Sequence, residues 1–371
     1  MGRDAPMNVT VALDGLGAER GAEVVVAGAK AAAADGIGLR VFGDPGELAA
    51  LEGVQGVEVI ETTESISNDV EPVAAVRSRP DSSIVRAARD VAEGRSSALA
   101  SAGSTGATMA AATFALRRLH GVRRPALAIQ LLVPGRDGPP TVILDVGANA
   151  EARPTDLVQF AFLGAAFSEA VLGIERPRVA LLSVGEEPKK GRLDIVDAHE
   201  QLARLTIAEA GQAEIRLNFV GNVEGRDLLA GTADVIVTDG FTGNVVLKTM
   251  EGTARTVADA VRSAARSGPR AALGGALLRP ALSGLRAQMD PDTTGGAILL
   301  GLNGVAVVGH GSSGPDGIAN AIRLAARAVG ERATERTAAL LERSGATRAA
   351  LRDKTYPRRD VPDGPLGRLT R

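Results

Sequence analysis

Short apolar runs alternate along the chain with longer segments in which apolar residues recur at helical spacing. The runs are rich in Val, Ile and Leu, which is typical of strands buried on both faces of a sheet. Strand followed by helix, repeated many times, predicts a mostly parallel sheet covered by helices on both sides. We expect strands at Thr10–Leu13, Leu39–Phe42, Val57–Ile60, Ala98–Ala100, Ala126–Leu132, Thr141–Asp145, Arg178–Val184, Ile215–Val220, Asp234–Thr238 and Val305–Val308, and helices at Ala22–Ala34, Ser82–Glu93, Asp156–Leu172, Asp194–Ala210 and Gly317–Ser344.

The 371 residues suit one large α/β domain with an insertion and a tail. We expect the domain to occupy residues 8–345. Residues 260–289 are predicted to form a basic amphipathic helical insertion, which Pro280 should split into two short helices. Residues 346–371 include a stretch rich in Pro, Gly and Arg, for which we predict disorder.

Polar and glycine residues follow most of the predicted strands. One such turn is ordinary loop chemistry. Ligands of parallel α/β sheets bind at the carboxyl ends of the strands, so we expect these turns to share one edge and to line a polar cleft. The turns are Asp14–Gly21, Ser101–Ala107, Asp145–Asn149, Ser183–Gly191, Gly221–Glu224 (which includes Asn222), Asp239–Asn244 and Gly309–Ser313.

The stretch Ala233–Lys248 is the clearest candidate for anion binding. A buried strand is followed by a glycine-rich turn, and then by a helix expected from Val245, whose free N–H groups would face the turn. Gly243 and Asn244 can approach a phosphate closely, and Lys248 can add a cation. The alternative is an ordinary β-α turn in which Asn244 only caps the helix.

A second candidate cradle precedes an Ala-rich helix. Gly103, Ser104, Thr105 and Gly106 offer backbone N–H groups and hydroxyls to a phosphate, although Thr105 could simply cap the helix. No Gly-x-x-x-x-Gly-Lys-Ser/Thr loop and no Gly-x-Ser-x-Gly elbow occur, which weighs against a P-loop nucleotidase and a serine hydrolase. The turn after Asp14 loosely resembles a dinucleotide fingerprint, but that carboxylate would lie close to a pyrophosphate.

Composition narrows the function classes further. The formal net charge of −2 gives no overall basic surface for nucleic acid. With only 2% aromatic residues, binding of nucleic acid by stacking on bases is also disfavoured. Cys is absent, which excludes disulfides, thiolate metal sites and cysteine nucleophiles. We expect no metal site and no cofactor, with a carboxylate-bound magnesium ion left open. His199 is expected at the surface, and His310 as an acid, a ligand donor or a structural histidine.

The N-terminus has no apolar signal-peptide core, and no run reaches the roughly 18 apolar residues of a spanning helix. We therefore expect a cytoplasmic protein. Lys is rare among the 42 basic residues, and Lys189, Lys190 and Lys248 lie in or beside glycine-rich turns, where a compact charge can reach phosphate.

Two basic segments are candidate interaction surfaces. One is the cluster Arg117, Arg118, Arg123 and Arg124, which can dock an acidic protein or can simply complement a helix C-terminus. The other is the insertion, which has no acidic residue from Ala260 to Met289 and repeats Leu at 273, 277 and 285. Leu273, Leu277 and Leu285 can lie on an anionic membrane or within a dimer interface.

Five ordered motifs resemble the bacterial PlsX-type phosphate acyltransferases. They are Leu144–Asn149, Leu157–Ala161, Phe219–Glu224, Thr238–Asn244 and His310–Ser313, and the likeness runs from Val9 to Ala328. The resemblance implies a three-layer α/β/α fold similar to phosphotransacetylases and isopropylmalate dehydrogenases, and a homodimer. It also implies transfer of a long acyl chain from acyl carrier protein to inorganic phosphate for phospholipid synthesis. The chain departs from the family pattern at Glu19, Ser104 and Gly314.

That chemistry needs no side-chain nucleophile, because phosphate itself attacks the thioester. We expect Lys190, Asn244 and His310 to be catalytic, with Gly103–Gly106 and Gly243 beside the phosphate. Asn149, Asn222 and Asp239 complete the expected binding set, the first and last as loop-orienting residues. The nearest alternative is a short-chain phosphotransacylase that uses acyl-coenzyme A; a nicotinamide dehydrogenase and a non-catalytic lipid-binding protein are more distant.

Overall fold

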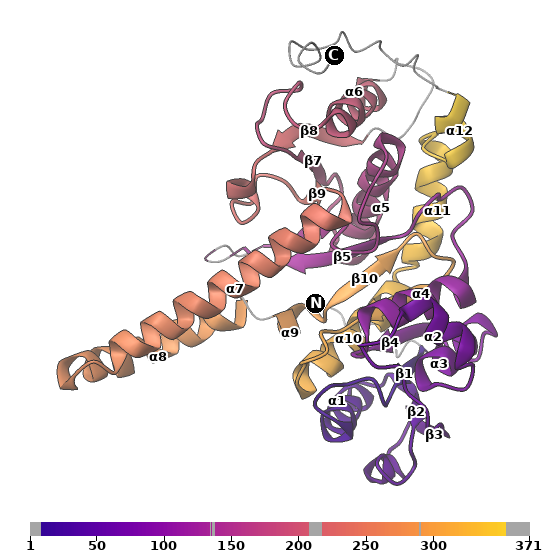
Figure 1. The fold of residues 1–371 in the computed structure, drawn as a ribbon, viewed down its shortest axis with the longest axis vertical. Coiled ribbons are helices and arrows are strands. Elements are labelled where there is room, and N and C mark those ends of the chain that lie inside the picture. Colours follow the sequence, from indigo (N-terminus) through magenta and orange to yellow (C-terminus); the bar gives the residue numbers. More distant parts are fainter. Residues whose placement is uncertain (1–8, 134, 136–137, 208–216, 289–290, 354–371) are drawn as a thin grey trace, which may run out of the picture.

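In the computed structural model, which describes residues 9–133, 135, 138–207, 217–288 and 291–353, a sheet of 11 strands runs through the body (Figure 1). Its order is β3-β2-β1-β4-β11-β10-β5-β6-β9-β7-β8. The strands are β1 Thr10–Asp14, β2 Gly38–Gly43, β3 Val57–Glu61, β4 Ala98–Ser101, β5 Ala126–Leu131, β6 Thr141–Leu144, β7 Arg178–Leu182, β8 Asn218–Val223, β9 Val235–Val237, β10 Ala297–Leu300 and β11 Val305–Val308.

Helices cover both faces of this sheet, so the predicted three-layer α/β/α fold is confirmed. One face is packed by α1 (Ala22–Ala34), α5 (Pro154–Leu172), α6 (Leu193–Ile207), α10 (Pro315–Gly330), α11 (Ala333–Arg343) and α12 (Arg348–Asp353). The other is packed by α2 (Pro72–Ser78), α3 (Ser83–Ala92), α4 (Thr105–Leu116) and the first turns of α7 (Gly240–Ala265). The remaining elements are η1 Ala49–Leu51, η2 Gly225–Asp227, α8 Pro269–Gln288 and α9 Pro291–Thr294.

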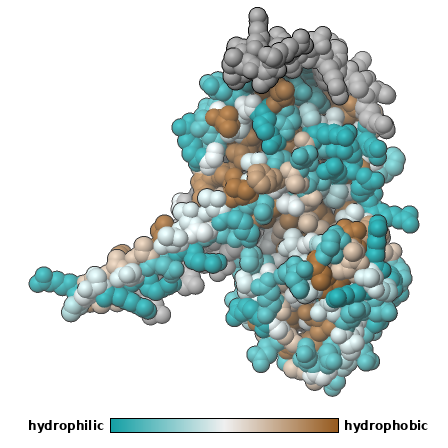
Figure 2. Space-filling view, viewed as in Figure 1, coloured by the Kyte–Doolittle hydropathy of each residue, from teal (hydrophilic) through white to brown (hydrophobic). Residues whose placement is uncertain are grey.

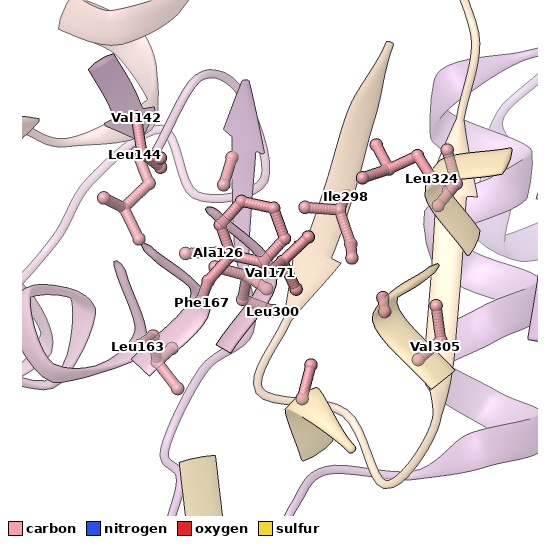
Figure 3. Close-up of a cluster of buried hydrophobic side chains, with 14 of the residues drawn as sticks. Ala126, Val142, Leu144, Leu163, Phe167, Val171, Ile298, Leu300, Val305 and Leu324 are labelled. Carbon is pink, nitrogen blue, oxygen red and sulfur yellow. The ribbon is translucent and has the colours of Figure 1, made fainter. Parts of the chain in front are cut away.

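Helix α5 is buried along nearly its whole length. Figure 3 shows Phe167 and Val171 of this helix beside Ala126 of β5 and Leu300 of β10, all of them buried. By length and composition α5 alone, within the described chain, could cross a bilayer, yet 83% of its apolar window is buried inside the body. Its apolar surface is therefore explained by packing against the sheet.

The sheet consists of two parallel halves that run in opposite directions. β3, β2, β1, β4 and β11 are parallel to one another, and so are β6, β9, β7 and β8. Between the halves, β10 is antiparallel to both β11 and β5, and β5 is antiparallel to β6. Three successive reversals leave the second half opposed to the first. The prediction of a mostly parallel sheet is correct, but β10 was not predicted.

Helices α7 and α8 project from the body as a long helical pair, called the arm below (Figure 1). The prediction that Pro280 splits this region is wrong, because α8 runs through Pro280. The chain instead turns at residues 266–268, and Pro269 begins α8, a position at which proline loses no helical hydrogen bond. Leu273 and Leu277 are 66% and 75% exposed, while the side chain of Leu285 lies outside the described set.

The folded chain extends past the predicted boundary at residue 345. Ala346 is buried, and α12 follows with Leu351 buried against the core. Gln159 of α5 holds this connection by donating from Nε2 to the Ala346 carbonyl at 3.0 Å. The folded part therefore reaches at least Asp353, and the remainder of the predicted tail lies outside the described residues.

Candidate active site

The polar strand ends form two groups at opposite edges of the sheet. The turns after β1, β4 and β11 leave one edge, called the first edge, and those after β6, β9, β7 and β8 leave the other, called the second edge. The prediction of one shared edge is therefore wrong, because the antiparallel pairing of β5 with β6 inverts the second half. β11 and β6 are separated by two strands, or about 14 Å at 4.8 Å per spacing.

Asp14 is the centre of the first edge. Its carboxylate is 3% exposed and accepts hydrogen bonds from Ser83 Oγ at 2.6 Å and Ser101 Oγ at 2.8 Å. A Cβ on Gly17 would lie 2.4 Å from Asp14 Oδ2 and 2.7 Å from the Cα of Gly103, so glycine is required where the two turns meet. Burial raises the pKa of Asp14, and the two serine hydroxyls partly offset that rise.

The candidate cradle at the start of α4 belongs to this edge. Ser104 rather than Thr105 is the N-cap, and its Oγ accepts from the Ala107 N–H at 3.4 Å. The amides of Thr105 and Gly106 therefore come ahead of the first helical hydrogen bond. A Cβ on Gly106 would lie 2.6 Å from Pro72 Cγ, so this glycine also lets α2 pack across the helix start.

His310 follows β11 at the same edge. Its Nδ1 accepts from the Ser312 N–H at 3.2 Å, and Ser312 Oγ lies 2.8 Å from the same nitrogen. Because a backbone N–H can only donate, the proton of the neutral ring is on Nε2, which leaves a donor for a ligand. Asp292, at the base of the arm, supports this loop by accepting from Ser313 Oγ at 2.6 Å and from the Gly314 N–H at 2.9 Å.

Asp145 is the centre of the second edge and is fully buried. It accepts five N–H donors at 2.7–3.1 Å, from Leu127, Gly147, Ala148 and both nitrogens of Asn149. Asn149 also donates to the Pro125 carbonyl at 2.7 Å. Burial raises the pKa of Asp145, while its hydrogen bonds oppose the rise. The network fixes the turn after β6 against the start of β5.

Helix α7 begins at Gly240, five residues before the predicted start, and this changes the role of the glycine-rich turn. Asp239 is the N-cap: its side chain accepts from the Thr242 N–H at 2.9 Å, and its carbonyl from the Gly243 N–H at 2.9 Å. The Gly240 N–H donates to the Asn149 carbonyl at 2.8 Å. The predicted use of the Gly243 amide for phosphate is therefore wrong, since that donor is used within the helix.

Gly243 instead permits close packing. A Cβ at this position would lie 1.9 Å from the Asp145 carbonyl oxygen. Asn244, the next residue, is exposed, and its Oδ1 would lie 3.9 Å from a Cβ on Gly147, so its side chain faces the turn after β6. Lys248, one turn further, is half exposed and pairs with Glu251 at 2.9 Å.

The turn after β7 carries Lys190 and is held against α7. Arg192 bridges Asp194 at 2.6 Å and the buried Asp239 at 2.9 Å, and the hydrogen bond that it donates to Asp194, together with the negative charge of both carboxylates, raises its pKa. Lys190 is exposed, with its Cγ 3.0 Å from where a Cβ on Gly185 would lie. The turn is thus close-packed at its base, and within the described residues no carboxylate pairs with the Lys190 ammonium group, which can meet an anion.

Asn222 supports the same turn from β8. Its Nδ2 donates to the Glu187 carbonyl at 3.0 Å, and its Oδ1 lies 2.9 Å from His199 Nδ1. His199 is 8% exposed and meets the Phe219 ring edge-on at 5.0 Å between centroids. The prediction that His199 is a surface residue is wrong, because the face of α6 that carries it packs on β8.

The four clustered arginines have different environments. Arg123 forms a bidentate pair with the buried Asp156, and burial together with neighbouring arginines lowers its pKa to about 10. Arg124 reaches the second edge, where its Nη1 lies 3.5 Å from Asn149 Oδ1 and 3.2 Å from the Glu151 carbonyl. Arg117 and Arg118 are exposed.

Three residues of the two groups were not predicted as site residues: Asp14, Asp145 and Arg192. Asp14 and Asp145 each stand at the end of a buried strand, before a glycine turn, which is the signal that could have identified these two carboxylates. Arg192 had no such signal, because its partner Asp239 is 47 residues away. Within the described chain, no three His, Asp or Glu side chains are grouped as a metal site would require.

Solved structures of other proteins share this α/β fold. A phosphotransacetylase from Streptococcus pyogenes superposes with a TM-score of 0.57 at 17% identity, covering 87% of this chain and 94% of that one. The EutD phosphotransacetylase from Staphylococcus aureus gives 0.55 at 16% identity, with coverages of 88% and 95%. At these identities the likeness concerns the fold alone.

The family follows from sequence. The profile of the family described as "Fatty acid synthesis protein" matches residues 9–336. A phosphate acyltransferase of Geobacillus sp. (strain WCH70) is 45% identical over 318 residues, covering 85% of this chain and 93% of that protein. One of Thermobifida fusca (strain YX) is 44% identical over 330 residues, with coverages of 88% and 89%. The chain belongs to the PlsX-type phosphate acyltransferase family and is an acyltransferase.

Proposed function

We propose that the enzyme transfers a long acyl chain from acyl carrier protein to inorganic phosphate, and that the acyl phosphate enters phospholipid synthesis. The family description, fatty acid synthesis, supports a fatty acyl donor, and the names of the relatives support phosphate as the acceptor. The observation that carries the choice of donor is the contact of Arg124 with Asn149. It makes the basic 117–124 segment continuous with the second edge, so an acidic carrier can bind beside it.

The reaction is proposed to occur at the second edge, because cations and amide donors gather there. Lys190 would hold phosphate against the thioester carbonyl, and Asn244 would donate to the oxyanion that develops as the phosphate oxygen attacks. Lys248 and Arg124 add positive charge around the same turns. The carrier thiol leaves as a thiolate, which is a good leaving group because an ordinary thiol has a pKa of about 8.5.

The first edge is proposed to have a supporting role. His310 Nε2–H and the amides of Thr105 and Gly106 form a set of neutral donors, and the cation beside this loop is Arg20, whose Nη1 would lie 3.0 Å from a Cβ on Gly314. A phosphate held at the second edge by contacts of about 3 Å cannot also touch the first, given the strands between them. His310 is therefore proposed to bind substrate groups remote from the attacked carbon rather than to protonate the departing sulfur.

The arm is proposed to bring the enzyme to a membrane surface as a peripheral, cytoplasmic homodimer. Figure 2 shows white and light-brown side chains along the arm and hydrophilic ones at its far end, where Arg266 and Arg270 flank the turn. Such a surface suits anionic headgroups over a shallow apolar contact. Vesicle flotation tests this: binding should require anionic lipid and should fall in Leu277→Glu. Binding indifferent to both changes would leave the arm as a dimer element.

The experiment that tests the reaction is a mass-spectrometric assay with palmitoyl-(acyl carrier protein) and inorganic phosphate. The proposal predicts acyl phosphate, with release of free carrier thiol that depends on phosphate. Folded enzyme that makes no acyl phosphate from this donor, but makes acetyl phosphate from acetyl-coenzyme A, would select the short-chain phosphotransacylase alternative.

A further inference from the structure

The last turn of α4 presents an aromatic ring to solvent among arginines. Phe114 is 45% exposed, although large apolar side chains are ordinarily buried. The Cζ atom of Arg77, from the neighbouring α2, lies 5.1 Å from the centre of the ring. Phe114 also lines a hollow of about 460 Å³ with Thr113, Arg117, Arg118, Leu119 and Val122. An apolar floor rimmed by cations is the composition of a protein-docking surface.

Positive charge is concentrated around this hollow. Burial lowers the pKa of Arg123, and the positive charges of Arg124, Arg153, Arg348 and Arg118 lower it further, so these guanidinium groups lie in one region. The buried Asp156 neutralises Arg123, the partly buried one of the five. The whole chain carries a formal net charge of −2, so this field is local rather than a property of the molecule. A local field of this kind attracts an acidic partner.

The backbone at Arg117 supports a role for its side chain. Arg117 ends α4 with φ 61° and ψ 169°, a conformation that is essentially confined to glycine. Its carbonyl accepts from the Asn303 N–H at 3.0 Å, and this contact fixes the conformation. Glycine would adopt this backbone conformation with less strain. The presence of arginine at this position therefore points to a role for its side chain.

The hollow lies at the second edge of the sheet. α4 starts at the first edge and its 12 residues span about 18 Å along the sheet, so that Phe114 lies near the opposite end. From there the chain passes Arg118, whose Nη1 donates to the Arg123 carbonyl at 2.6 Å, and reaches Arg124 beside Asn149. A protein bound at the hollow thus adjoins the turns that carry Asn244 and Lys190.

We propose that Phe114, Arg77, Arg117 and Arg118 form the docking surface for the acidic carrier protein that delivers the acyl thioester. This inference rests on the proposed function and adds Arg77 and Phe114 to the sequence-based surface. Arg123 is left out of the docking surface because Asp156 neutralises its charge, and Arg124 is assigned to the reaction site instead. The arginines pair with carboxylates of the carrier, and an apolar side chain of the carrier covers Phe114.

The test measures steady-state acyl phosphate formation against carrier concentration for Arg77→Glu, Arg118→Glu and Phe114→Ala. Arg89→Glu, which reverses an exposed arginine on α3, is the matched control. The KM for the acyl carrier should rise at least tenfold in each charge reversal and several-fold in Phe114→Ala, with kcat within twofold. The wild-type KM should also rise with salt more steeply than that of Arg77→Glu.

Three outcomes are distinguishable. If the wild type makes no acyl phosphate from the acyl carrier, the proposed function fails, and the docking surface fails with it. If the wild type is active and folded Arg77→Glu and Arg118→Glu keep its KM, the docking surface alone is wrong. If those variants keep the KM but change the sedimentation coefficient, the hollow is an interface between copies of this chain.

Discussion

Asp14 at the first edge and Asp145 at the second both adjoin a buried strand and are almost inaccessible, but their partners differ. Asp14 is held by the hydroxyls of Ser83 and Ser101, which come from distant elements. Asp145 is held mainly by backbone N–H groups, three of them from its own turn. A hydroxyl can reverse from donor to acceptor, whereas a backbone N–H cannot.

The difference indicates which edge is the more rigid. At the second edge one carboxylate fixes a turn, the start of β5 and, through Asn149, the start of α7. At the first edge the carboxylate joins two glycine turns through side chains that can reorient. Transition-state stabilisation requires donors that do not reorganise, and the second edge meets this requirement together with nearby cations.

The largest expected effect is a difference in the free energy of unfolding between variants of the two carboxylates. Asp145→Asn places an amide NH₂ against donors that cannot become acceptors, so we expect a loss of about 3 kcal/mol or more in the free energy of unfolding. Asp14→Asn should cost only about 1 kcal/mol, because Ser83 and Ser101 can rotate. Urea unfolding at neutral pH measures both values. Equal costs would contradict the assigned difference in rigidity.

A smaller effect is expected at Arg117. Arg117→Gly relieves the unfavourable backbone conformation and should stabilise the fold by about 1 kcal/mol, while it weakens binding of the acyl carrier. Thermal unfolding and the carrier KM measure the two changes. A lower Tm for Arg117→Gly would show that the backbone at this position is not strained.

The smallest effect concerns pH and the first edge. Burial raises the pKa of Asp14 above its ordinary 3.8, so the folded state favours the protonated carboxyl. Its contribution to stability is complete below that ordinary value and is lost as the pH rises through the raised pKa. Unfolding of the wild type and Asp14→Asn between pH 3.5 and 7 should show the wild type losing stability relative to the variant. A relative gain would mean that the serines favour the carboxylate.

The sequence predicts the layers better than the arrangement of the site. Strands such as Val305–Val308 can be recognised from an unbroken apolar run rich in Val, and the structure has them. β10 has only four apolar residues, between glycines and a polar turn, and its pairing with β5 depends on residues about 170 positions earlier. β10 is antiparallel to both of its neighbours and so leaves β5 parallel to β11, whereas the antiparallel pairing of β5 with β6 reverses the second half of the sheet. That reversal, which the strand pattern does not reveal, moves Asn244 and Lys190 to a different edge from Ser104 and His310.

Helix starts show the same limit on a smaller scale. Gly240 and Gly243 favour a turn by propensity, yet both lie in the first turn of α7. Glycine is needed there because a Cβ would collide with the backbone of Asn149 or Asp145. Pro280 conversely favours a break that the structure does not have. In both cases contacts or chain geometry outside the local sequence decide the conformation, which local patterns cannot report.

The most direct test compares the kcat of variants at the two edges, measured at saturating phosphate and acyl carrier. Lys190→Ala and Asn244→Ala should each lower kcat at least tenfold, or about 1.4 kcal/mol in activation free energy, whereas Lys189→Ala, the matched control, should stay near wild type. His310→Ala should lose less than threefold in kcat. Wild-type turnover in folded Lys190→Ala, or a loss in His310→Ala as large as in Asn244→Ala, would contradict a reaction centre at the second edge.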